Sequence, residues 1–437
     1  MTYFNKVLLL GTGPTAIQLA MNFKNYYNGK VAIAGRESLR SNMFFETLVQ
    51  HQLALKVYIQ NTQHQSVAGT CTIDAFFKGY HTISGNWDTI VLSVTTDSYI
   101  SVLAQIDTKV LKEASCFILI SPTFGSSHLI TNFLKNVSPQ AEVISFSTYY
   151  GDTRWLLGEI PSNEVLTTGV KKTVYIGSTY SKSDRLDELS ELFRYLGIHL
   201  KKVASPLEAE TRNISLYVHP PLFMNDFSLK VIFDEKKITK YVYKLYPEGP
   251  ITYTMIRHLL NYWKEMMAIV KHFNIQPLNL LEFMVDDNYP LQPESIARQE
   301  IENFNKLKSI HQEYLLYIRY ASLLIDPFSI PNQEGRYFDF SAVPLRRIFK
   351  NHDGEWDIPR MPKEDYYRVK IIQGIANALK LKSPTLDYFV QTYEDKLQQV
   401  EALLENKVYS EAFQVKSFSQ EIEMICNELI LSKEQNE

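Results

Sequence analysis

Residues 6–16 read Lys-Val-Leu-Leu-Leu-Gly-Thr-Gly-Pro-Thr-Ala, a short apolar run followed at once by a glycine-rich turn. The turn has the pattern Gly-x-Gly-x-x-Ala, and it follows a predicted strand and opens a predicted helix. Gly11 permits a tight turn, Gly13 lets the backbone approach a pyrophosphate, and Ala16 allows helix and strand to pack closely. N–H groups at the helix start would then face phosphate. The residues predicted to bind a dinucleotide are Gly11, Thr12, Gly13, Pro14, Thr15 and Ala16. The alternative is a glycine turn with a purely structural role.

Further apolar runs follow, and helical patterns separate them. With the first strand, Lys6–Leu10, the predicted strands are Val31–Ala34, Thr89–Val94, Cys116–Ile120, Val143–Phe146, Thr173–Ile176 and Ile198–Val203. Continuous apolar strands that alternate with helices indicate a parallel sheet covered on both faces. The loops after such strands lie at one edge of the sheet, where ligands bind. The loops expected to form this crevice are Gly11–Thr15, Gly35–Arg40, Thr95–Tyr99, Ser121–Ser127 and Ser147–Arg154.

The pattern changes near residue 205, and long stretches with helical periodicity follow. These predicted helices are Thr254–Phe273, Glu302–Leu324, Asp365–Leu381 and Leu386–Leu404. A chain of 437 residues is long enough for two domains. The sequence therefore predicts an α/β protein in which a Rossmann-type parallel-sheet domain spans residues 1–204. A mostly α-helical domain over residues 205–437 is expected to provide substrate binding and catalysis.

The bulk composition excludes several classes of partner. The formal net charge is -3, which disfavours nucleic acid or an anionic membrane as a partner. No apolar run approaches the roughly 18 residues of a membrane span. The three cysteines, Cys71, Cys116 and Cys426, lie far apart, so neither a disulfide framework nor a thiolate metal site is expected. We therefore predict a cytoplasmic protein with no bound metal.

The end of the second predicted strand indicates which dinucleotide binds. An NAD enzyme usually carries an acidic residue there, whereas this chain has Gly35 followed by Arg36. A guanidinium can pair with a 2′-phosphate, and a charge-assisted hydrogen bond contributes roughly 1.5–3 kcal/mol. The acidic residue Glu37 favours NAD instead. The alternative for Arg36 is a solvent-exposed loop residue that binds no phosphate. The predicted cofactor is NADP(H), and the residues expected at the 2′-phosphate are Arg36, Ser38 and Arg40. Other residues that follow predicted strands and are expected to line the cofactor are Thr95, Pro122 and Thr123.

His219 is the predicted acid–base residue, because histidine exchanges protons near neutral pH. It lies just after the predicted domain boundary, in Tyr-Val-His-Pro-Pro. The two prolines are expected to stop any helix at the histidine and to fix the backbone there. Asn225 and Asp226 are nearby polar residues that could orient the ring. The alternative is a histidine of the core or of a helix cap.

Asp152 lies in Gly-Asp-Thr-Arg, in the loop predicted after the strand Val143–Phe146. A carboxylate there could raise the pKa of a neighbouring histidine and hold its tautomer. Arg154 and Arg212 are candidates for binding a substrate carboxylate. The alternatives are a turn aspartate with a local arginine partner and an arginine with a structural or surface role.

Longer blocks along the chain carry a family resemblance. They are Ser121–Ser126, Gly151–Arg154, Leu166–Lys172, Ala209–Asp226, Tyr241–Lys244, Pro247–Thr252, Leu324–Phe328 and Tyr337–Pro344. These blocks resemble the staphylopine and pseudopaline type of opine dehydrogenase, which completes nicotianamine-like bacterial metallophores. The resemblance covers nearly the whole chain.

The resemblance implies an NADPH-dependent reductive condensation. A histidine that carries an aminobutyrate unit would condense with a 2-oxo acid, pyruvate or 2-oxoglutarate, and the imine would be reduced to a metal chelator. It implies that His219 is the acid–base residue, that Asp152 is its partner and that Arg36 binds the 2′-phosphate. The family's second basic residue sits slightly later than Arg40 does here. The resemblance also implies a homodimer.

Two other functions stay open at this stage. One is an opine dehydrogenase that acts on an ordinary amino acid and a 2-oxo acid. The other is an NADP-binding sensor without turnover.

Overall fold

The computed structural model describes residues 2–434 except 159, 235–237, 325–340 and 404–407. The chain divides into two compact units. The first comprises Met1–Asn213 together with Glu423–Glu437, and the second comprises Ile214–Ile422. The sequence pattern changes from alternating strands and helices to long helices near residue 205, a little before the start of the second unit.

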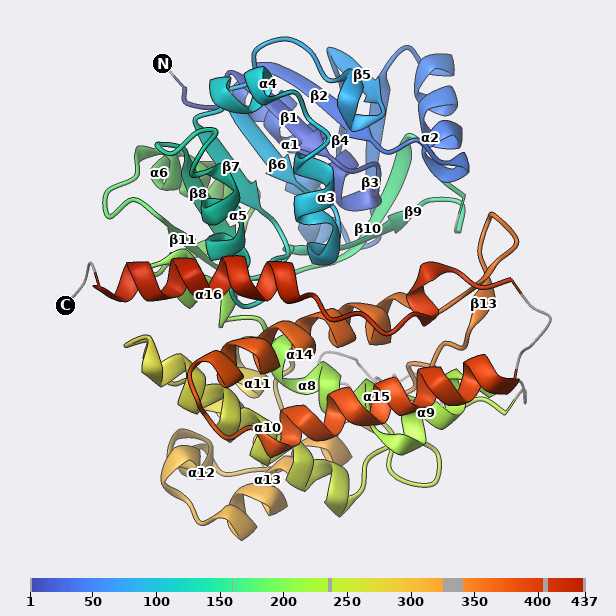
Figure 1. The fold of residues 1–437 in the computed structure, drawn as a ribbon, viewed down its shortest axis with the longest axis vertical. Coiled ribbons are helices and arrows are strands. Elements are labelled where there is room, and N and C mark those ends of the chain that lie inside the picture. Colours follow the sequence, from blue (N-terminus) through green and yellow to red (C-terminus); the bar gives the residue numbers. More distant parts are fainter. Residues whose placement is uncertain (1, 159, 235–237, 325–340, 404–407, 435–437) are drawn as a thin grey trace. The chain divides into compact units, whose positions relative to one another are not determined.

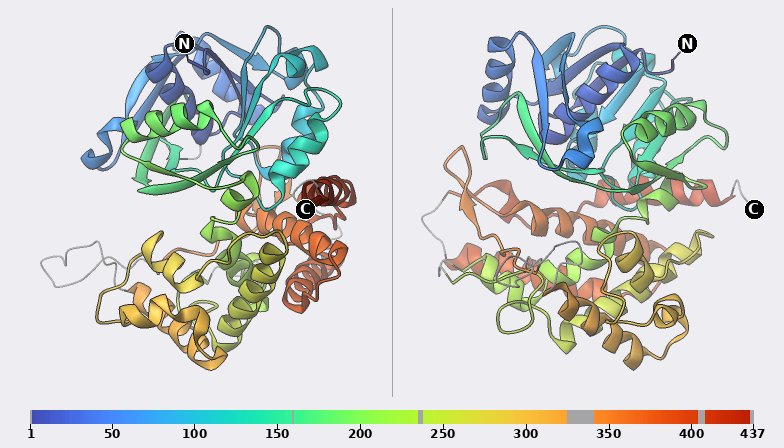
Figure 2. Two further views of the ribbon diagram at one scale, coloured as in Figure 1. Left: turned by 90° about the vertical axis from the view of Figure 1, so that its left-hand side faces the viewer. Right: turned by 180° about the vertical axis from the view of Figure 1, so that it is seen from behind.

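The large sheet of the first unit is mostly parallel, as predicted. In the described part of the chain its strand order is β12-β11-β8-β7-β6-β1-β2-β5, and only the β8–β11 pair runs antiparallel. Its strands are β1 (Lys6–Leu10), β2 (Lys30–Gly35), β5 (Ala75–Lys78), β6 (Thr89–Leu92), β7 (Cys116–Leu119), β8 (Glu142–Phe146), β11 (Thr173–Ser178) and β12 (His199–Lys202). The central strands are almost wholly buried, because helices cover both faces (Figures 1 and 2). The predicted α/β class is confirmed.

A second, smaller sheet in the first unit is absent from the sequence-based prediction. Its strand order is β4-β3-β10-β9. Its strands are β3 (Ala54–Ile59), β4 (Gly69–Thr72), β9 (Gly151–Trp155) and β10 (Glu164–Val170). The helix α1 (Pro14–Tyr27) packs against both sheets and joins them. The Gln18 side chain accepts hydrogen bonds from the hydroxyls of Tyr149, Thr153 and Thr167, which fixes α1 to the small sheet.

The other helices of the first unit connect or flank these strands. They are α2 (Leu39–Gln50), α3 (Tyr99–Leu103), α4 (Thr108–Glu113), α5 (Ser126–Leu134), α6 (Asp184–Tyr195) and α7 (Pro206–Glu210). The last helix, α16 (Ser419–Glu434), belongs to this unit from Glu423 onward. An ion pair of 2.7 Å joins Lys135, at the end of α5, to Glu428 of α16.

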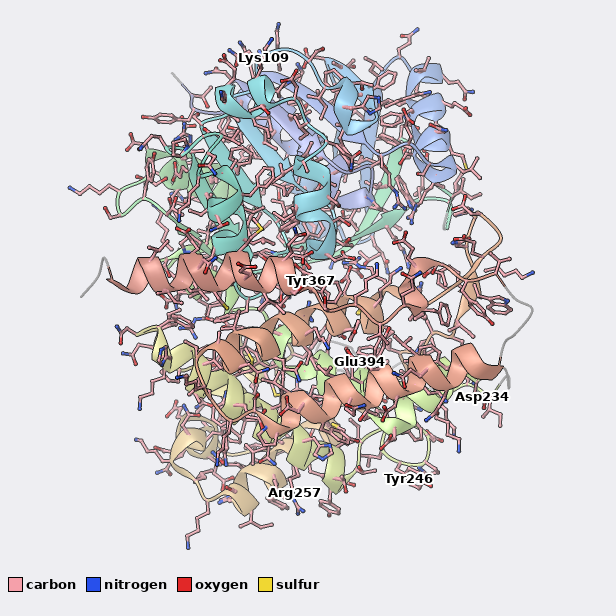
Figure 3. The ribbon with its side chains drawn as sticks, viewed as in Figure 1. Lys109, Asp234, Tyr246, Arg257, Tyr367 and Glu394 are labelled. Carbon is pink, nitrogen blue, oxygen red and sulfur yellow. The ribbon has the colours of Figure 1, made fainter. Side chains whose placement is uncertain are left out.

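The second unit is mostly helical, as predicted. Its helices are α8 (Ile214–Phe223), α9 (Asp226–Ile232), α10 (Tyr253–His272), α11 (Leu280–Asp286), α12 (Arg298–Glu302), α13 (Ser309–Ala321), α14 (Arg360–Ala378) and α15 (Pro384–Leu403). A short hairpin joins β13 (Phe349–Lys350) to β14 (Trp356–Asp357). Helix α8 packs against α10 and α14. The Glu394 carboxylate of α15, labelled in Figure 3, accepts from the Tyr366 hydroxyl at 2.7 Å and the Lys370 ammonium at 2.6 Å, both on α14.

Two predictions about helices are wrong. The prolines after His219 do not stop a helix, because α8 continues through Pro220 and Pro221 to Phe223. The Leu216 carbonyl, which Pro220 leaves without its usual helical donor, accepts from the Tyr262 hydroxyl at 2.9 Å instead.

The predicted single helix 302–324 is also wrong. Helix α12 ends at Glu302, and α13 begins only at Ser309. The Asn279 side-chain amide donates to the carbonyls of Ile301 and Glu302, which occupies acceptors that a continuing helix would use.

Candidate active site

The glycine turn after β1 is held tightly against its neighbours. Gly11 has a φ of +123°, a region that favours glycine, and its N–H donates to the Ala34 carbonyl at 2.8 Å. A Cβ at this position would lie 3.0 Å from the Ser93 carbonyl oxygen. The turn is therefore pressed between the ends of β2 and β6, as the motif requires.

The start of α1 offers open space where the motif predicts a phosphate. Gly13 is the N-cap residue and brings no side chain that could cap the helix, and Pro14 occupies the first turn. A Cβ at Gly13 would have no described heavy atom within 4 Å. A helix N-terminus with an open approach fits an anionic pyrophosphate. The turn thus fits the cofactor that the sequence predicts, and Thr15 and Ala16 lie in the first turn of the same helix.

The turns after β1 and β2 are joined by a hydroxyl network. The Thr12 and Ser41 hydroxyl oxygens are 3.3 Å apart, and the Ser38 hydroxyl donates to that of Ser41 at 3.1 Å. Ser38 is the N-cap of α2, because its hydroxyl also accepts from the Ser41 N–H at 3.2 Å. A Cβ at Gly35 would lie 2.4 Å from the Thr12 methyl group, so Gly35 lets the two turns approach.

Arg36 and Arg40 are both exposed, the first directly after β2 and the second in the first turn of α2. This placement leaves the Arg36 guanidinium accessible at the carboxyl edge of the sheet, next to the glycine turn. Its contact with a 2′-phosphate stays a prediction, as does that of Arg40.

The predicted lining residues differ in exposure. Thr95 is exposed and precedes a short 3-10 turn, where its hydroxyl oxygen lies 3.2 Å from that of Ser98. Pro122 and Thr123 are buried in the turn between β7 and α5. The Thr123 N–H donates to the Ser126 hydroxyl at 3.0 Å, while the buried Thr123 hydroxyl has no partner among the described residues.

Glu210 is a buried residue that sequence reasoning missed. Its carboxylate accepts from the N–H groups of Gly125 at 2.9 Å and Ser127 at 2.7 Å, and from the Ser145 hydroxyl at 2.9 Å. Burial raises the pKa of Glu210 to about 7, although these hydrogen bonds act in the opposite direction. The side chain fixes the start of α5 and therefore the turn that contains Pro122 and Thr123.

Asp152 and Arg154 lie in a strand, not in the predicted loop. Both are exposed residues of β9, and the intervening Thr153 points to Gln18 in the interior. The Asp152 carboxylate accepts from the Thr168 hydroxyl of β10 at 2.7 Å. The loop prediction failed because β9 pairs with β10, a strand that the sequence pattern did not reveal. The catalytic role of Asp152 and the binding role of Arg154 stay predictions.

Arg212 is half-buried at the end of the first unit. It forms an ion pair of 3.1 Å with Glu208, four residues earlier. This is the local pairing expected of an arginine with a structural role, and binding of a substrate carboxylate by Arg212 stays a prediction.

His219 of α8 has a buried carboxylate beside it. Its Nδ1 lies 3.7 Å from an oxygen of Asp365, whose side chain is 1% exposed. That same oxygen accepts from the Arg368 guanidinium at 2.5 Å, and Arg368 also donates to the Ser215 carbonyl at 3.3 Å. The His219 ring packs edge-to-face on Phe223. The sequence placed Asp365 at the start of a helix but did not connect it with His219.

The residues expected to orient His219 have other partners. The Asn225 side chain caps α9 by accepting from the Ser228 N–H at 2.9 Å. The Asp226 carboxylate accepts from the Tyr388 hydroxyl at 3.1 Å. Asp365, rather than Asn225 or Asp226, is the residue that forms the ion-pair contact with the His219 ring.

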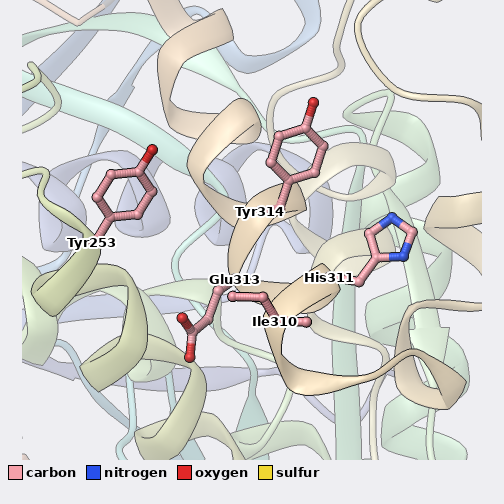
Figure 4. A pocket seen from close by; sticks show the side chains of 5 residues that line it. All are labelled: Tyr253, Ile310, His311, Glu313 and Tyr314. Atoms are coloured by element: carbon pink, nitrogen blue, oxygen red, sulfur yellow. The ribbon is translucent and has the colours of Figure 1, made fainter.

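A surface pocket between α10 and α13 contains none of the predicted site residues. Its lining residues are Tyr253, Ile310, His311, Glu313 and Tyr314 (Figure 4). Among the described residues no group of three or more histidine, cysteine, aspartate or glutamate side chains could hold a metal ion. No helix in the described part of the chain is long and apolar enough to cross a membrane.

The fold and the glycine turn define a class first: an α/β protein that binds a dinucleotide and carries a helical second unit. A family model described as staphylopine dehydrogenase matches residues 5–429. Staphylopine synthase of Staphylococcus aureus is 46% identical over 416 residues, 95% of this chain and 96% of that protein. Pseudopaline synthase of Pseudomonas aeruginosa is 35% identical over 389 residues, 89% of each chain.

A solved structure of yersinopine dehydrogenase with NADP+ bound matches this fold with a TM-score of 0.91 at 26% identity. The match covers 99% of this chain and 100% of that one. The chain therefore belongs to the staphylopine dehydrogenase family. The predicted family and the predicted class of enzyme, an opine dehydrogenase, are confirmed.

Proposed function

We propose that this enzyme reduces the imine formed between a histidine-aminobutyrate amine and a 2-oxo acid, pyruvate or 2-oxoglutarate, to give a staphylopine-like metallophore. The observation that carries the proposal is the pair formed by His219 and the buried Asp365 in a chain of this family. The amine and the 2-oxo acid are the small-molecule partners of the reaction.

NADP(H) is the cofactor, and it supplies the hydride. The turn of Gly11, Thr12 and Gly13 fits the pyrophosphate, because the start of α1 is open and carries no side-chain cap. Arg36 would pair with the 2′-phosphate, since it is exposed directly after β2. The NADP+ in yersinopine dehydrogenase supports the choice of the phosphorylated cofactor.

His219 would move the protons of the condensation. Attack of an amine on a ketone needs a neutral amine, so a base assists that step, and loss of water from the carbinolamine needs an acid. One imidazole can do both in turn. A proton on Nδ1, the nitrogen that faces Asp365, leaves Nε2 to exchange protons with the substrate.

Asp365 acts as a positioning residue in this account. Its carboxylate is held by Arg368 at 2.5 Å and is almost fully buried, so it has little freedom to turn away from His219. Asp152 is the other candidate partner, on the basis of the family resemblance. Substitution of each carboxylate separates the two.

The product identifies the reaction directly. Purified enzyme is incubated with NADPH, the histidine-derived amine and equal amounts of pyruvate and 2-oxoglutarate, and the products are measured by mass spectrometry. We expect one condensed and reduced product to dominate. If free amino acids react as fast as the histidine-derived amine, the enzyme is an opine dehydrogenase of ordinary amino acids. If no mixture oxidises NADPH, the sensor alternative holds.

We also propose that the enzyme works in the cytoplasm as a homodimer. Three widely separated free cysteines support a reducing compartment, and the family resemblance supports the dimer. Light scattering of the purified protein tests the dimer, because a monomeric mass over micromolar concentrations would contradict it.

A further inference from the structure

Arg319 is a buried cation on the core-facing side of α13. The buried residues of this helix are Gln312, Leu315, Leu316, Arg319 and Tyr320, which follow helical spacing. Arg319 therefore occupies a position where an apolar side chain is expected, and it is 2% exposed. A charged group in such a position needs partners that replace water.

The partners that Arg319 has in the described residues do not satisfy it. Its Nη2 donates to the backbone carbonyls of Tyr289 at 2.9 Å and Met284 at 3.4 Å. Its Nε and Nη1 have no hydrogen-bond partner among the described residues. Two buried donors of a charged group are thus left for an acceptor that these residues do not supply, and such donors are rare in folded proteins.

Among the described residues, the groups that act on the charge of Arg319 are aromatic hydroxyls, and no carboxylate is one of them. Those groups are Tyr243, Tyr289 and Tyr320, and burial lowers the pKa of Arg319 to about 10. The Tyr320 hydroxyl is also buried and without a partner in the described residues. The described residues therefore offer a positive charge and a hydroxyl donor at this site, and they supply no carboxylate to balance that charge.

This cluster is electrostatically connected with the His219–Asp365 pair in the same unit. The charges of both Arg319 and Asp365 act on the buried Tyr243. The second oxygen of Asp365, which is not the one that pairs with Arg368, has no hydrogen-bond partner among the described residues. Tyr243 is therefore within electrostatic range of both the unsatisfied cation and the carboxylate that lies 3.7 Å from His219.

We propose that Arg319 binds a carboxylate of one of the two substrates, with the Tyr320 hydroxyl as a second donor. The inference rests on the proposed function, in which both the amine and the 2-oxo acid carry carboxylates. A guanidinium recognises a carboxylate through charge-assisted hydrogen bonds, which are stronger than neutral ones. The bound carboxylate would complete the hydrogen bonds of Nε and Nη1.

The test compares each substrate with an analogue in which one carboxylate is replaced by an amide. The first pair is the preferred 2-oxo acid and its C1 amide, and the second pair is the histidine-derived amine and its carboxamide. We measure kcat/KM for both members of each pair in wild type and in Arg319→Met. For one pair, the preference for the carboxylate should fall by about 10–100-fold in the variant. The pair that changes identifies which substrate Arg319 binds.

The ratio makes the test insensitive to partial unfolding, because a smaller active fraction scales both members of a pair equally. If Arg319 only supports the carbonyls of Met284 and Tyr289, both ratios stay at the wild-type value, and the proposal is overturned. If Arg319→Met does not fold, Tyr320→Phe, which removes one hydroxyl, is measured in the same way. An unchanged preference in that variant also overturns the proposal.

The matched control is Arg298→Met in the same unit. Arg298 is exposed and paired with Asp286 and Glu302, so its loss should leave both ratios unchanged. Failure of the proposed function looks different from failure of this inference. In the first case wild-type enzyme forms no product from the amine and the 2-oxo acid, whereas in the second it forms product and only the ratios stay constant.

Discussion

The glycine turn of the first unit and the proposed acid–base residue His219 of the second are built from the sequence in different ways. In the turn, Gly11, Thr12 and Gly13 follow one another, and the strand before them and the helix after them belong to the same short segment, although β2 and β6 also hold the turn in place. At His219 the important contact comes from Asp365 on α14, a helix that lies far away in the sequence. A site made from one segment can be found in the sequence, whereas a site assembled from distant helices needs the fold.

Substitution of the two candidate partners of His219 tests whether its partner comes from a distant helix. We expect Asp365→Asn to lower kcat by about 100-fold, because it removes the charge beside Nδ1, and to alter the pH profile of kcat. Asp152→Asn should have a smaller effect on the acid–base step if Asp365 is the partner. A larger loss in Asp152→Asn, with a normal pH profile in Asp365→Asn, would restore the assignment made from the family resemblance.

Gly13→Ala tests whether the glycine turn binds the pyrophosphate of the cofactor. A Cβ at Gly13 contacts no described atom within 4 Å, so we expect no steric loss and only a small fall in melting temperature, because alanine is a poorer N-cap residue than glycine. We expect NADPH binding to weaken by about 10–100-fold, because the pyrophosphate must approach this backbone closely. Fluorescence titration of NADPH measures the effect. Unchanged affinity would place the pyrophosphate elsewhere.

Gly35→Ala is the matched control for that prediction. Its Cβ would lie 2.4 Å from the Thr12 methyl group, so this variant should lose stability, by roughly 1–3 kcal/mol as for overpacked cores. The two alanine substitutions thus separate a glycine kept for ligand approach from a glycine kept for packing.

The raised pKa of Glu210 predicts how the stability of the first unit depends on pH. Burial raises the pKa of Glu210 in the folded state to about 7, above the ordinary value of 4.5. The folded state therefore binds the Glu210 proton more tightly than the unfolded state does. This stabilises the folded state fully below pH 4.5, and the stabilisation is lost as the pH rises through about 7. Between pH 5 and pH 8 the wild type should lose about 2 kcal/mol of unfolding free energy that Glu210→Gln does not lose. Urea denaturation at both pH values checks this, and parallel curves for the two proteins would contradict it.

Arg36→Ala is expected to have the smallest effect of the series. It should narrow the preference for NADPH over NADH by about 10-fold, because one charge-assisted contact with the 2′-phosphate is lost. The ratio of kcat/KM for the two cofactors measures the preference. An unchanged ratio would mean that other residues hold the phosphate, and Arg40→Ala would then be the next variant.

The sheet of the first unit was predictable where a strand is one continuous apolar run. β1, β6, β7 and β8 are such runs, and the structure places them within a residue or two of their predicted bounds. The small sheet was missed because its strands mix buried and exposed residues, as in β9, where Asp152 and Arg154 alternate with Thr153. Their pairing with distant strands decides the structure, and a local pattern does not reveal that pairing.

The candidate site was predictable to the same extent. The turn and His219 were proposed from short motifs, and their roles stay predictions, whereas Glu210 was missed because it accepts from the N–H of Gly125, 85 positions earlier in the chain. Arg319 had a local signal, a charged residue on the buried stripe of α13, but only the fold shows that two of its donors lack partners. The prediction of a helix end at the prolines of α8 failed in part because Tyr262, on another helix, donates to the Leu216 carbonyl that Pro220 leaves free.

In the proposed mechanism, the glycine turn binds the cofactor, and His219 transfers the protons. NADPH affinity and turnover of His219→Gln, measured on one preparation, test it directly. We predict nearly wild-type affinity for NADPH and a loss of turnover of about 100-fold or more. Wild-type turnover in this variant, or a parallel loss of NADPH binding, would contradict the account.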